Sequence, residues 1–186
     1  RQATSKIEPI HSRFLAAALE SSHAGDRELF GEFWRLAVGS DESWPVPTDV
    51  IIEAETVIEA NQRVDITIFD RISSRCLGIE VKTTEASTTD GQLEAYYQGL
   101  MSKDWGSKYR ESDRPVKVRM AYLTPFNQRH FPDQSEHSRR EFLAFKRKQA
   151  ESVHLSWIDV ATIPLQHPGD LWAQHQEFVL DDMCTP

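Results

Sequence analysis

The sequence has little cysteine and no long apolar run, and each absence excludes a class of protein. Its two cysteines, Cys76 and Cys184, cannot by themselves build a disulfide framework or a zinc site. No stretch approaches the roughly 18 uncharged apolar residues of a membrane span, and no basic start followed by an apolar segment marks a secretory signal. We therefore expect a cytoplasmic protein that works in a reducing compartment and has no membrane partner.

Several catalytic signatures are missing as well. There is no Gly-x-x-x-x-Gly-Lys loop, so we expect no nucleotide cofactor. No serine stands in a Gly-x-Ser-x-Gly turn, which excludes the usual nucleophile of the α/β-hydrolases. The histidines lack the His-Glu-x-x-His spacing of zinc proteases. We expect surface or core positions for most of them: His23, His130, His137, His154, His167 and His175.

The length of 186 residues suits a single domain with a substantial core. Hydrophobic residues make up 39% and charged residues 27% of the chain, which is ordinary for a globular protein. No repeat, low-complexity tract or linker divides residues 1–186. We expect the core over about residues 7–124 and additional elements over residues 125–186. Because the chain opens at Arg1 rather than Met, the sequence leaves open whether it is a fragment of a longer protein.

Negative charge dominates the sequence as a whole but not every part of it. The formal net charge of −8, taken as an average, argues against a nucleic-acid partner. Residues 103–148, however, hold 12 Lys and Arg against six Asp and Glu, a net charge of +6, whereas the rest of the chain carries −14. Such a window is either an ordinary solvated surface or a track for phosphates. Composition alone does not decide between the two.

The spacing of apolar residues predicts helices and strands in an order typical of α/β domains. We expect helices over residues 7–20, 26–38, 88–102, 135–150 and 171–180, and strands over residues 50–58, 63–70, 75–83, 116–124 and 153–157. In the first helix, one side is expected to be formed by Ile10, Phe14, Ala17 and Ala18. This order predicts a mixed sheet flanked by helices.

The second and third expected strands bring charged side chains together. If these strands form a tight hairpin, its turn is centred between Ile72 and Ser73. Asp65 then lies directly opposite Glu80, and Lys82 lies two residues further along on the same face of the sheet. The apolar residues of both strands occupy the opposite face. The pattern therefore predicts two carboxylates and one ammonium group side by side.

The facing carboxylates of Asp65 and Glu80 would repel each other unless a cation or a proton relieves them. Hard oxygen ligands of this kind suit Mg²⁺ or Mn²⁺, and such a metal polarises a phosphoryl oxygen and activates an attacking water. Lys82 would orient that water and stabilise the charge that develops on the phosphate. The alternative is a cross-strand ion network on a solvated face of the sheet. Glu53 and Glu55, on the preceding strand, are expected on an exposed face.

The helix expected after this hairpin supplies two more polar side chains. Gln92 and Tyr96 are four residues apart and therefore share one face of the helix. Together with Asp65 and the Glu80-Val81-Lys82 tripeptide, they make the sequence resemble the PD-(D/E)XK nuclease superfamily. The Gln-x-x-x-Tyr element is similar to the RecB-type branch of that superfamily. Val64 stands where the superfamily motif has proline, a position that is frequently replaced.

The N-terminal segment extends the resemblance. It contains Glu8-x-x-His11-Ser12 in an expected helix, which is similar to a bacterial subgroup of the superfamily, although Ala24 stands where that subgroup often has glycine. By this resemblance Glu8 is an acidic residue that approaches the metal, and His11 lies beside it as an accessory residue. The resemblance covers about residues 7–124. It implies the restriction-endonuclease-like αβββαβ core, with a mixed central sheet flanked by helices.

The resemblance also implies an enzyme that hydrolyses DNA with Mg²⁺ or Mn²⁺. The implied catalytic residues are Asp65, Glu80, Lys82, Gln92, Tyr96 and Glu8, of which Asp65, Glu80 and Glu8 hold the metal. The basic window predicts a DNA-binding set made up of Lys103, Arg139, Arg140, Lys146, Arg147 and Lys148. Because the rest of the chain is acidic, we also expect help from a partner chain, a neighbouring domain or a second copy.

Four other interpretations stay open at this point. The chain could be a binding or scaffold module that keeps the nuclease fold without catalysis, or a nuclease that acts on RNA. It could also be an effector domain of a larger anti-phage or restriction assembly that is inactive until a partner assembles it, or an α/β domain unrelated to nucleases. The complete set of matching polar residues counts against a module that has lost catalysis. Nothing in the sequence separates DNA from RNA as the substrate.

Overall fold

A computed structural model describes most of the chain. It covers residues 8–39, 41–58, 62–82, 91–102, 105, 109, 115–124, 136–149, 152–166, 169 and 172–177, and of residues 8 and 136–138 it describes the backbone alone. Its helices are α1 (Glu8–Ala24), α2 (Glu28–Val38), α3 (Gln92–Met101), α5 (Glu136–Lys148) and α6 (Trp157–Ala161). Its strands are β1 (Val50–Val57), β2 (Arg63–Asp70), β3 (Arg75–Val81), β4 (Lys117–Thr124) and β5 (Val153–Ser156). Residues 172–177 are helical as well.

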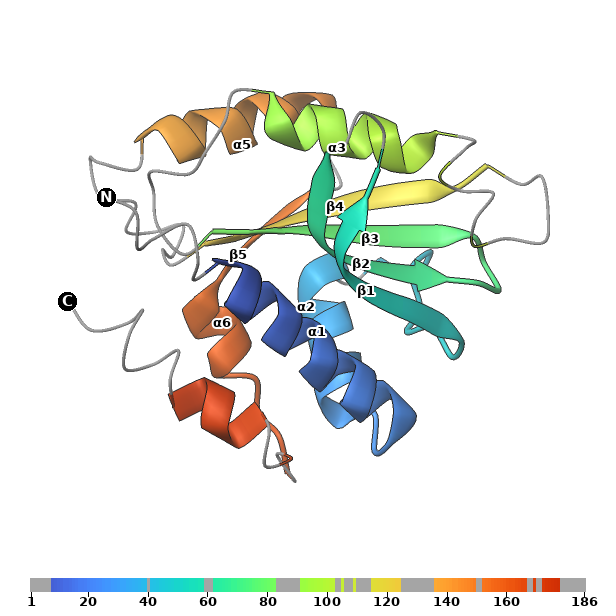
Figure 1. Ribbon diagram of the computed structural model, residues 1–186, viewed down its shortest axis with the longest axis vertical. Coiled ribbons are helices and arrows are strands. Elements are labelled where there is room, and N and C mark those ends of the chain that lie inside the picture. Colours follow the sequence, from blue (N-terminus) through green and yellow to red (C-terminus); the bar gives the residue numbers. More distant parts are fainter. Residues whose placement is uncertain are drawn as a thin grey trace.

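The strands form one five-stranded sheet in the order β1-β2-β3-β4-β5. β1, β2 and β3 pair antiparallel, whereas β4 runs parallel to β3 and β5 runs parallel to β4. Figure 1 shows that α3 and α5 cover one face of this sheet and that α1, α2 and α6 cover the other. The predicted mixed sheet flanked by helices is therefore confirmed. None of the described helices is long and apolar enough to cross a membrane.

β2 and β3 form the predicted hairpin. They pair so that Ile66 faces Ile79, which is the register expected from the turn. The carboxylate of Asp70 accepts hydrogen bonds from the backbone N–H groups of Ile72 (3.1 Å) and Ser73 (3.2 Å) and so closes the turn. Because the turn residues are adjacent in the chain, the register of the two strands is set locally.

Alternation along the strands divides the buried hydrophobic residues between two clusters, one on each face of the sheet. Leu77 and Ile79 of β3 belong to the cluster that α1 and α2 complete. Cys76 of β3 and Met120 of β4 belong to the cluster that α3 and α5 complete. Cys76 is fully buried there, and burial raises the pKa of its thiol. The alternation predicted for β3 is therefore confirmed.

α3 approaches the sheet closely at Gly78 of β3. A Cβ atom at this position would lie 2.7 Å from both Leu100 Cδ1 of α3 and Met120 Sδ of β4, which is closer than such atoms pack. A second glycine, Gly99 of α3, faces Ile58, and a Cβ atom there would lie 2.7 Å from Ile58 Cδ1. Glycine therefore sets the height of α3 above the sheet.

The buried side of α1 differs from the predicted one. Ile10 is 60% exposed and Ala17 is exposed, whereas His11, Leu15 and Leu19 are buried. These three stand four residues apart and form one seam along the helix. The prediction was wrong at Ile10 because it ranked positions by hydrophobicity and so left the polar His11 out of the buried side.

The last predicted strand is one residue too long. β5 ends at Ser156, and Trp157 begins α6 instead of continuing the strand. The Ser156 hydroxyl accepts a hydrogen bond from the Asp159 N–H (3.0 Å), and the Asp159 carboxylate accepts one from the Ser156 N–H (3.0 Å). This reciprocal capping box starts the helix. The Ser-x-x-Asp pattern is visible in the sequence and is the signal that the strand prediction missed.

Candidate active site

The hairpin register brings Asp65 and Glu80 together as predicted. The β2–β3 ladder ends at the pair Ile66 and Ile79, one step before the two acids. Beyond this last pair, the backbone N–H of Val81 donates its hydrogen bond to a side chain of β2 and not to the β2 backbone. The acceptor is Asp65 Oδ2, at 2.7 Å. The two carboxylates are close enough for the charge of Asp65 to act on Glu80.

Glu80 is a buried acid, with 2% of its surface exposed. Its Oε1 lies 2.6 Å from Lys82 Nζ, and its Oε2 has no hydrogen-bond partner among the described residues. Burial raises the pKa of Glu80 well above its ordinary value, the charge of Asp65 raises it further, and Lys82 opposes both effects. One oxygen of the buried carboxylate is therefore available to a cation.

Lys82 stands at the first position after β3. Its side chain is only 6% exposed, and its ammonium group pairs with Glu80. The backbone N–H of Lys82 donates to the Leu123 carbonyl (2.7 Å), and its carbonyl accepts a hydrogen bond from the indole N–H of Trp157 (3.2 Å). Lysine is rarely buried unless it is paired, and the ion pair with Glu80 supplies that partner.

α3 adds a hydrogen-bonded pair to the same group of residues. Gln92 Nε2 donates to the Tyr96 hydroxyl at 2.7 Å, as expected of side chains four residues apart on a helix. Burial and, after it, the negative charge of Glu80 raise the pKa of Tyr96 to about 12. The hydroxyl is therefore protonated at neutral pH and able to donate. The charges of Asp65 and Lys82 also act on Tyr96, so the structure brings all five of these predicted residues together.

The N-terminal residues of the predicted site are described only in part. Glu8 is the first residue of α1, and its side chain lies outside the described atoms, so its approach to a metal stays a prediction. His11 is buried, with its ring centroid 5.7 Å from that of Trp157 and 5.6 Å from that of His175. His11 is thus one aromatic ring away from the carbonyl of Lys82, to which Trp157 donates.

Glu53 and Glu55 of β1 are less exposed than predicted. Both are half-buried. Glu53 accepts a hydrogen bond from the Tyr109 hydroxyl, and Glu55 Oε1 accepts one from Ser12 Oγ of α1 at 3.5 Å. The expectation of an exposed strand face was wrong because residues distant in the sequence cover this strand.

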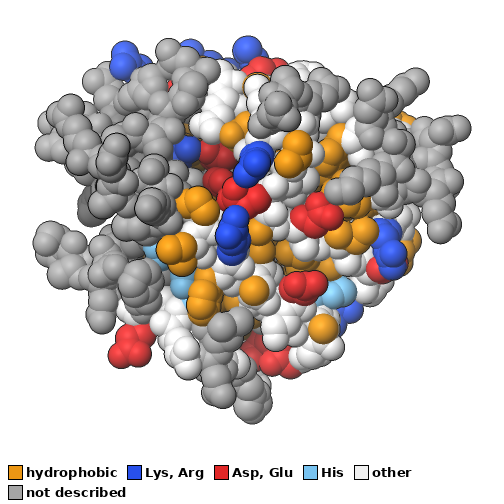
Figure 2. Space-filling model, in the orientation of Figure 1, with side chains coloured by type: hydrophobic (Ala, Val, Ile, Leu, Met, Phe, Trp, Pro, Cys, Tyr) orange, Lys and Arg blue, Asp and Glu red, His pale blue; other side chains and the backbone are white. Residues whose placement is uncertain are grey.

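The basic helix α5 carries most of the predicted DNA-binding set. Five of these residues are exposed on it: Arg139, Arg140, Lys146, Arg147 and Lys148. Phe142 and Phe145 are buried on its other side. In Figure 2 Lys and Arg side chains gather along the top edge of the molecule, where Figure 1 places α5. The sixth member of the set, Lys103, lies outside the described residues.

Arg119, which the sequence counts in the +6 window, is not a surface residue. It is buried on β4, and its guanidinium donates to the Val38 carbonyl (2.8 Å) and to the Asp41 carboxylate. The guanidinium also lies over the Trp44 ring, 4.6 Å from its centroid. Arg119 therefore ties β4 to the segment after α2, and the charge available for phosphates is smaller than the sequence count.

A buried polar pair beside the site was missed altogether. Thr124 Oγ1 and His154 Nε2 lie 2.8 Å apart at the ends of β4 and β5. The β3–β4 register pairs Val81 with Leu123, so Thr124 follows at the level of Lys82. Burial lowers the pKa of His154 to about 4, which keeps the ring neutral near pH 7. No local pattern marks this pair, because sheet formation alone brings the two residues together.

Comparison with known proteins identifies the family. A family model of the PD-(D/E)XK nuclease superfamily matches residues 2–163, a range that spans every element from α1 to α6. The chain belongs to the PD-(D/E)XK nuclease superfamily. Comparisons with curated proteins and with solved structures gave no match. Membership of the PD-(D/E)XK superfamily implies a nuclease, and these enzymes generally use divalent metals such as Mg²⁺ or Mn²⁺.

The acidic residues of this PD-(D/E)XK chain fit a divalent metal that is held by few protein ligands. Within the described residues, no three Asp, Glu, His or Cys side chains gather into a metal-binding group. Mg²⁺, however, usually keeps several waters and takes only one or two protein carboxylates. Glu80 Oε2, a buried oxygen without a hydrogen-bond partner in this part of the chain, is the kind of atom that such an ion binds. Asp65 and Glu80 are therefore the residues that would hold the metal.

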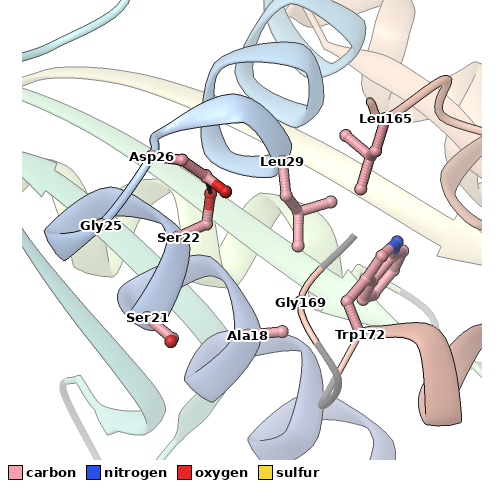
Figure 3. A pocket seen from close by; sticks show the side chains of 9 residues that line it. All are labelled: Ala18, Ser21, Ser22, Gly25, Asp26, Leu29, Leu165, Gly169 and Trp172. Carbon is pink, nitrogen blue, oxygen red and sulfur yellow. Dashed lines mark hydrogen bonds between the residues drawn. The ribbon is translucent and has the colours of Figure 1, made fainter. Parts of the chain in front are cut away.

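A pocket of about 210 Å³ lies elsewhere in this PD-(D/E)XK chain, between α1, α2 and the C-terminal segment (Figure 3). Leu29, Leu165 and Trp172 form its apolar wall, and Ser21 and Asp26 lie at its polar edge. None of the residues that line it belongs to the acidic group on β2 and β3. The pocket is therefore separate from the candidate active site.

Proposed function

We propose that this chain is a metal-dependent nuclease that hydrolyses DNA phosphodiester bonds. The observation that carries the proposal is the group formed by half-buried Asp65 with buried Glu80 and Lys82, in which one Glu80 oxygen has no hydrogen-bond partner among the described residues. A buried carboxylate with an unsatisfied oxygen costs free energy. A divalent cation would offset that cost, which supports a metal site rather than a purely structural ion pair.

In the proposed site Asp65 and Glu80 hold Mg²⁺ or Mn²⁺, and Glu8 of α1 contributes a third acid. When bound, the metal polarises a phosphate oxygen and lowers the pKa of the attacking water. Lys82 orients that water and stabilises the negative charge that develops on the phosphate. Its pairing with Glu80 at 2.6 Å supports this role, because the ammonium group is held beside the metal-binding oxygens.

Two helices complete the proposed site. On α3, Gln92 fixes the hydroxyl of Tyr96, which donates a hydrogen bond to the substrate. On α1, His11 accompanies Glu8 as an accessory residue. The Gln-x-x-x-Tyr element favours the RecB-type branch of the superfamily, and the Glu-x-x-His-Ser helix favours its bacterial subgroup.

A basic helix, α5, lies on the same face of the sheet as α3 (Figure 1) and supports a nucleic-acid substrate. DNA is proposed because the resemblance implies it. The exposed α5 residues Arg139, Arg140, Lys146, Arg147 and Lys148 would contact the phosphate backbone, and Lys103 would extend this set. The acidic remainder of the chain favours a partner chain, a neighbouring domain or a second copy that helps to hold DNA. A cytoplasmic role in anti-phage defence or restriction is part of the proposal.

The direct test is cleavage of plasmid and linear DNA in the presence of Mg²⁺ or Mn²⁺. We expect Glu80→Gln and Lys82→Ala each to lower the cleavage rate by about 10³-fold or more. When catalytic residues act as a unit, removing one of them abolishes most of the effect of all. Glu20→Gln, which changes an exposed acid of α1 in the same way, should leave the rate unchanged. A wild type that cuts no nucleic acid, or Glu80→Gln and Lys82→Ala proteins that cut as fast as the wild type, would refute the proposal.

Two further assays distinguish the other interpretations. Cleavage of RNA, measured under the same conditions, tests the substrate class. Cleavage of RNA without cleavage of DNA would correct the proposed substrate. Titration with Mn²⁺ separates an enzyme from a binding module. A wild type that binds Mn²⁺ no more tightly than Glu80→Gln would favour a nuclease fold that is used without catalysis.

A further inference from the structure

Both backbone groups of Lys82 make hydrogen bonds with distant parts of the chain. Its N–H donates to the Leu123 carbonyl at 2.7 Å, and Lys82 itself follows the last residue of β3. A donor to its carbonyl comes from a helix and not from the sheet.

The indole of Trp157 supplies that donor. Its Nε1 donates to the Lys82 carbonyl at 3.2 Å, and the whole side chain is buried. The backbone of Trp157 is fixed by the capping box at Ser156, which starts α6. Its ring centroid lies 5.7 Å from that of His11 and 5.9 Å from that of His175. The ring cannot turn away from Lys82 without displacing these neighbours.

We propose that Trp157 is a positioning residue for Lys82. By fixing the peptide plane after Lys82, the indole N–H sets the direction in which the lysine side chain leaves the backbone. The ammonium group is then held 2.6 Å from Glu80. This inference rests on the proposed nuclease function, because it explains how the ammonium group is aimed. It also explains the buried His11, whose ring supports the ring of Trp157.

A matched pair of variants isolates the hydrogen bond from its contribution to stability. Trp157→Phe removes the indole N–H and keeps an aromatic ring. Trp34→Phe does the same elsewhere, since Trp34 is also fully buried and its indole N–H donates to the Trp44 carbonyl at 3.1 Å. Both variants lose one buried N–H···O=C bond and should unfold at similarly lowered temperatures. Of the two variants, only Trp157→Phe removes a donor from the Lys82 carbonyl.

NMR of the lysine side chains tests the placement without relying on activity. We expect the ε-carbon resonance of Lys82, assigned by its loss in Lys82→Arg, to shift in Trp157→Phe and to keep its wild-type position in Trp34→Phe. An unchanged Lys82 resonance in Trp157→Phe would overturn the positioning role. If Trp157→Phe does not fold, the hydrogen-exchange rate of the Trp157 indole N–H in the wild type provides the test. Exchange as fast as that of a free indole would also overturn the positioning role.

Kinetics on DNA supply the second measurement. We expect Trp157→Phe to lower kcat about 10-fold or more with KM nearly unchanged, because small displacements of a catalytic group are costly. Trp34→Phe should change neither constant. Equal losses of kcat in both variants would indicate general destabilisation and overturn the positioning role. A wild type that cuts no nucleic acid would refute the proposed function instead, and the NMR result would still decide the role of Trp157.

Discussion

At the scale of single residues, two opposing effects act on the ionisation of the Glu80 carboxyl group. Burial favours the protonated carboxyl group, whereas Lys82 favours the ionised one. An unsatisfied buried acceptor costs about 1–3 kcal/mol, and Glu80 Oε2 is such an acceptor within the described part of the chain. The unsatisfied oxygen therefore makes this group of residues less stable than its packing suggests, a conflict that is typical of functional sites.

A divalent metal should consequently stabilise the folded chain. At a Mn²⁺ concentration of about 100 times Kd, we expect the free energy of unfolding to rise by about 2.7 kcal/mol. Glu80→Gln should lose most of this rise, because a neutral amide is a poorer ligand than a carboxylate. Urea unfolding with Mn²⁺ and with a chelator measures both, and Glu20→Gln is the exposed control. Equal stabilisation of the wild type and Glu80→Gln would mean that the metal binds elsewhere.

His175 predicts a loss of stability in acid. Burial, with a smaller contribution from His11, lowers the pKa of His175 from 6.5 to about 4, so between these values the unfolded chain binds a proton that the folded chain does not. The stability from this group is therefore present above about pH 6.5 and is lost as the pH falls through about 4, by at most about 3 kcal/mol. The free energy of unfolding, measured with urea across this pH range, should fall less in His175→Phe than in the wild type. The variant keeps an aromatic ring against Phe14. A wild-type profile as flat as that of the variant would contradict the lowered pKa.

At the scale of elements, local signals are enough for the hairpin but not for the contacts that complete the site. The β2–β3 register follows from the turn between the two strands, so the two acids can be placed from the sequence alone. The bond from Trp157 to Lys82, by contrast, joins residues 75 apart, and the pair of Arg119 and Asp41 joins residues 78 apart. Periodicity does not encode such contacts, because they depend on how helices from distant parts of the chain pack.

The close contact of α3 with β3 predicts the effect of one added methyl group. In Gly78→Ala the new Cβ would meet Leu100 and Met120 at 2.7 Å, so α3 must rise or these buried side chains must shift. We expect a loss of stability of roughly 1–3 kcal/mol and a fall in nuclease rate, because α3 carries Tyr96. Gly169→Ala is the control, since a Cβ atom there meets nothing within 4 Å. Thermal unfolding and DNA cleavage measure the two effects, and a Gly78→Ala protein as stable as the control would contradict the prediction.

The exposed face of α5 predicts how salt affects DNA binding. Arg140 and Arg147 are seven residues apart, so they lie close to one line along the helix. If each contacts a phosphate, replacing both with Gln should reduce the slope of log affinity against log salt by about 2. Arg13→Gln, exposed on α1 across the sheet, should leave the slope unchanged. Fluorescence anisotropy of a labelled duplex, in the presence of a chelator, measures the slope. An unchanged slope in the double variant would mean that these α5 residues do not contact phosphates.

At the scale of the whole molecule, the candidate site lies at one end of β3 and draws residues from both layers of helices. α3 supplies Gln92 and Tyr96 from one face of the sheet, and α6 supplies Trp157 from the other (Figure 1). Each layer has its own hydrophobic cluster. A substitution that loosens either cluster should therefore disturb part of the site, even when it lies far from the acids.

The distribution of charge over the whole chain predicts that this chain alone binds DNA weakly. Its net charge of −8 opposes binding, and Arg119 contributes nothing to the surface because it is buried against Asp41. We expect a Kd on the order of 10⁻⁵ M at physiological salt and a steep loss of affinity between about 50 and 200 mM salt. Anisotropy titrations of a duplex in chelator measure both quantities. A tight complex that tolerates salt would contradict the prediction and would remove the reason to expect a partner chain, a neighbouring domain or a second copy. If DNA binding is weak but tightens at chain concentrations where sedimentation shows self-association, a second copy of the chain is what helps to hold DNA.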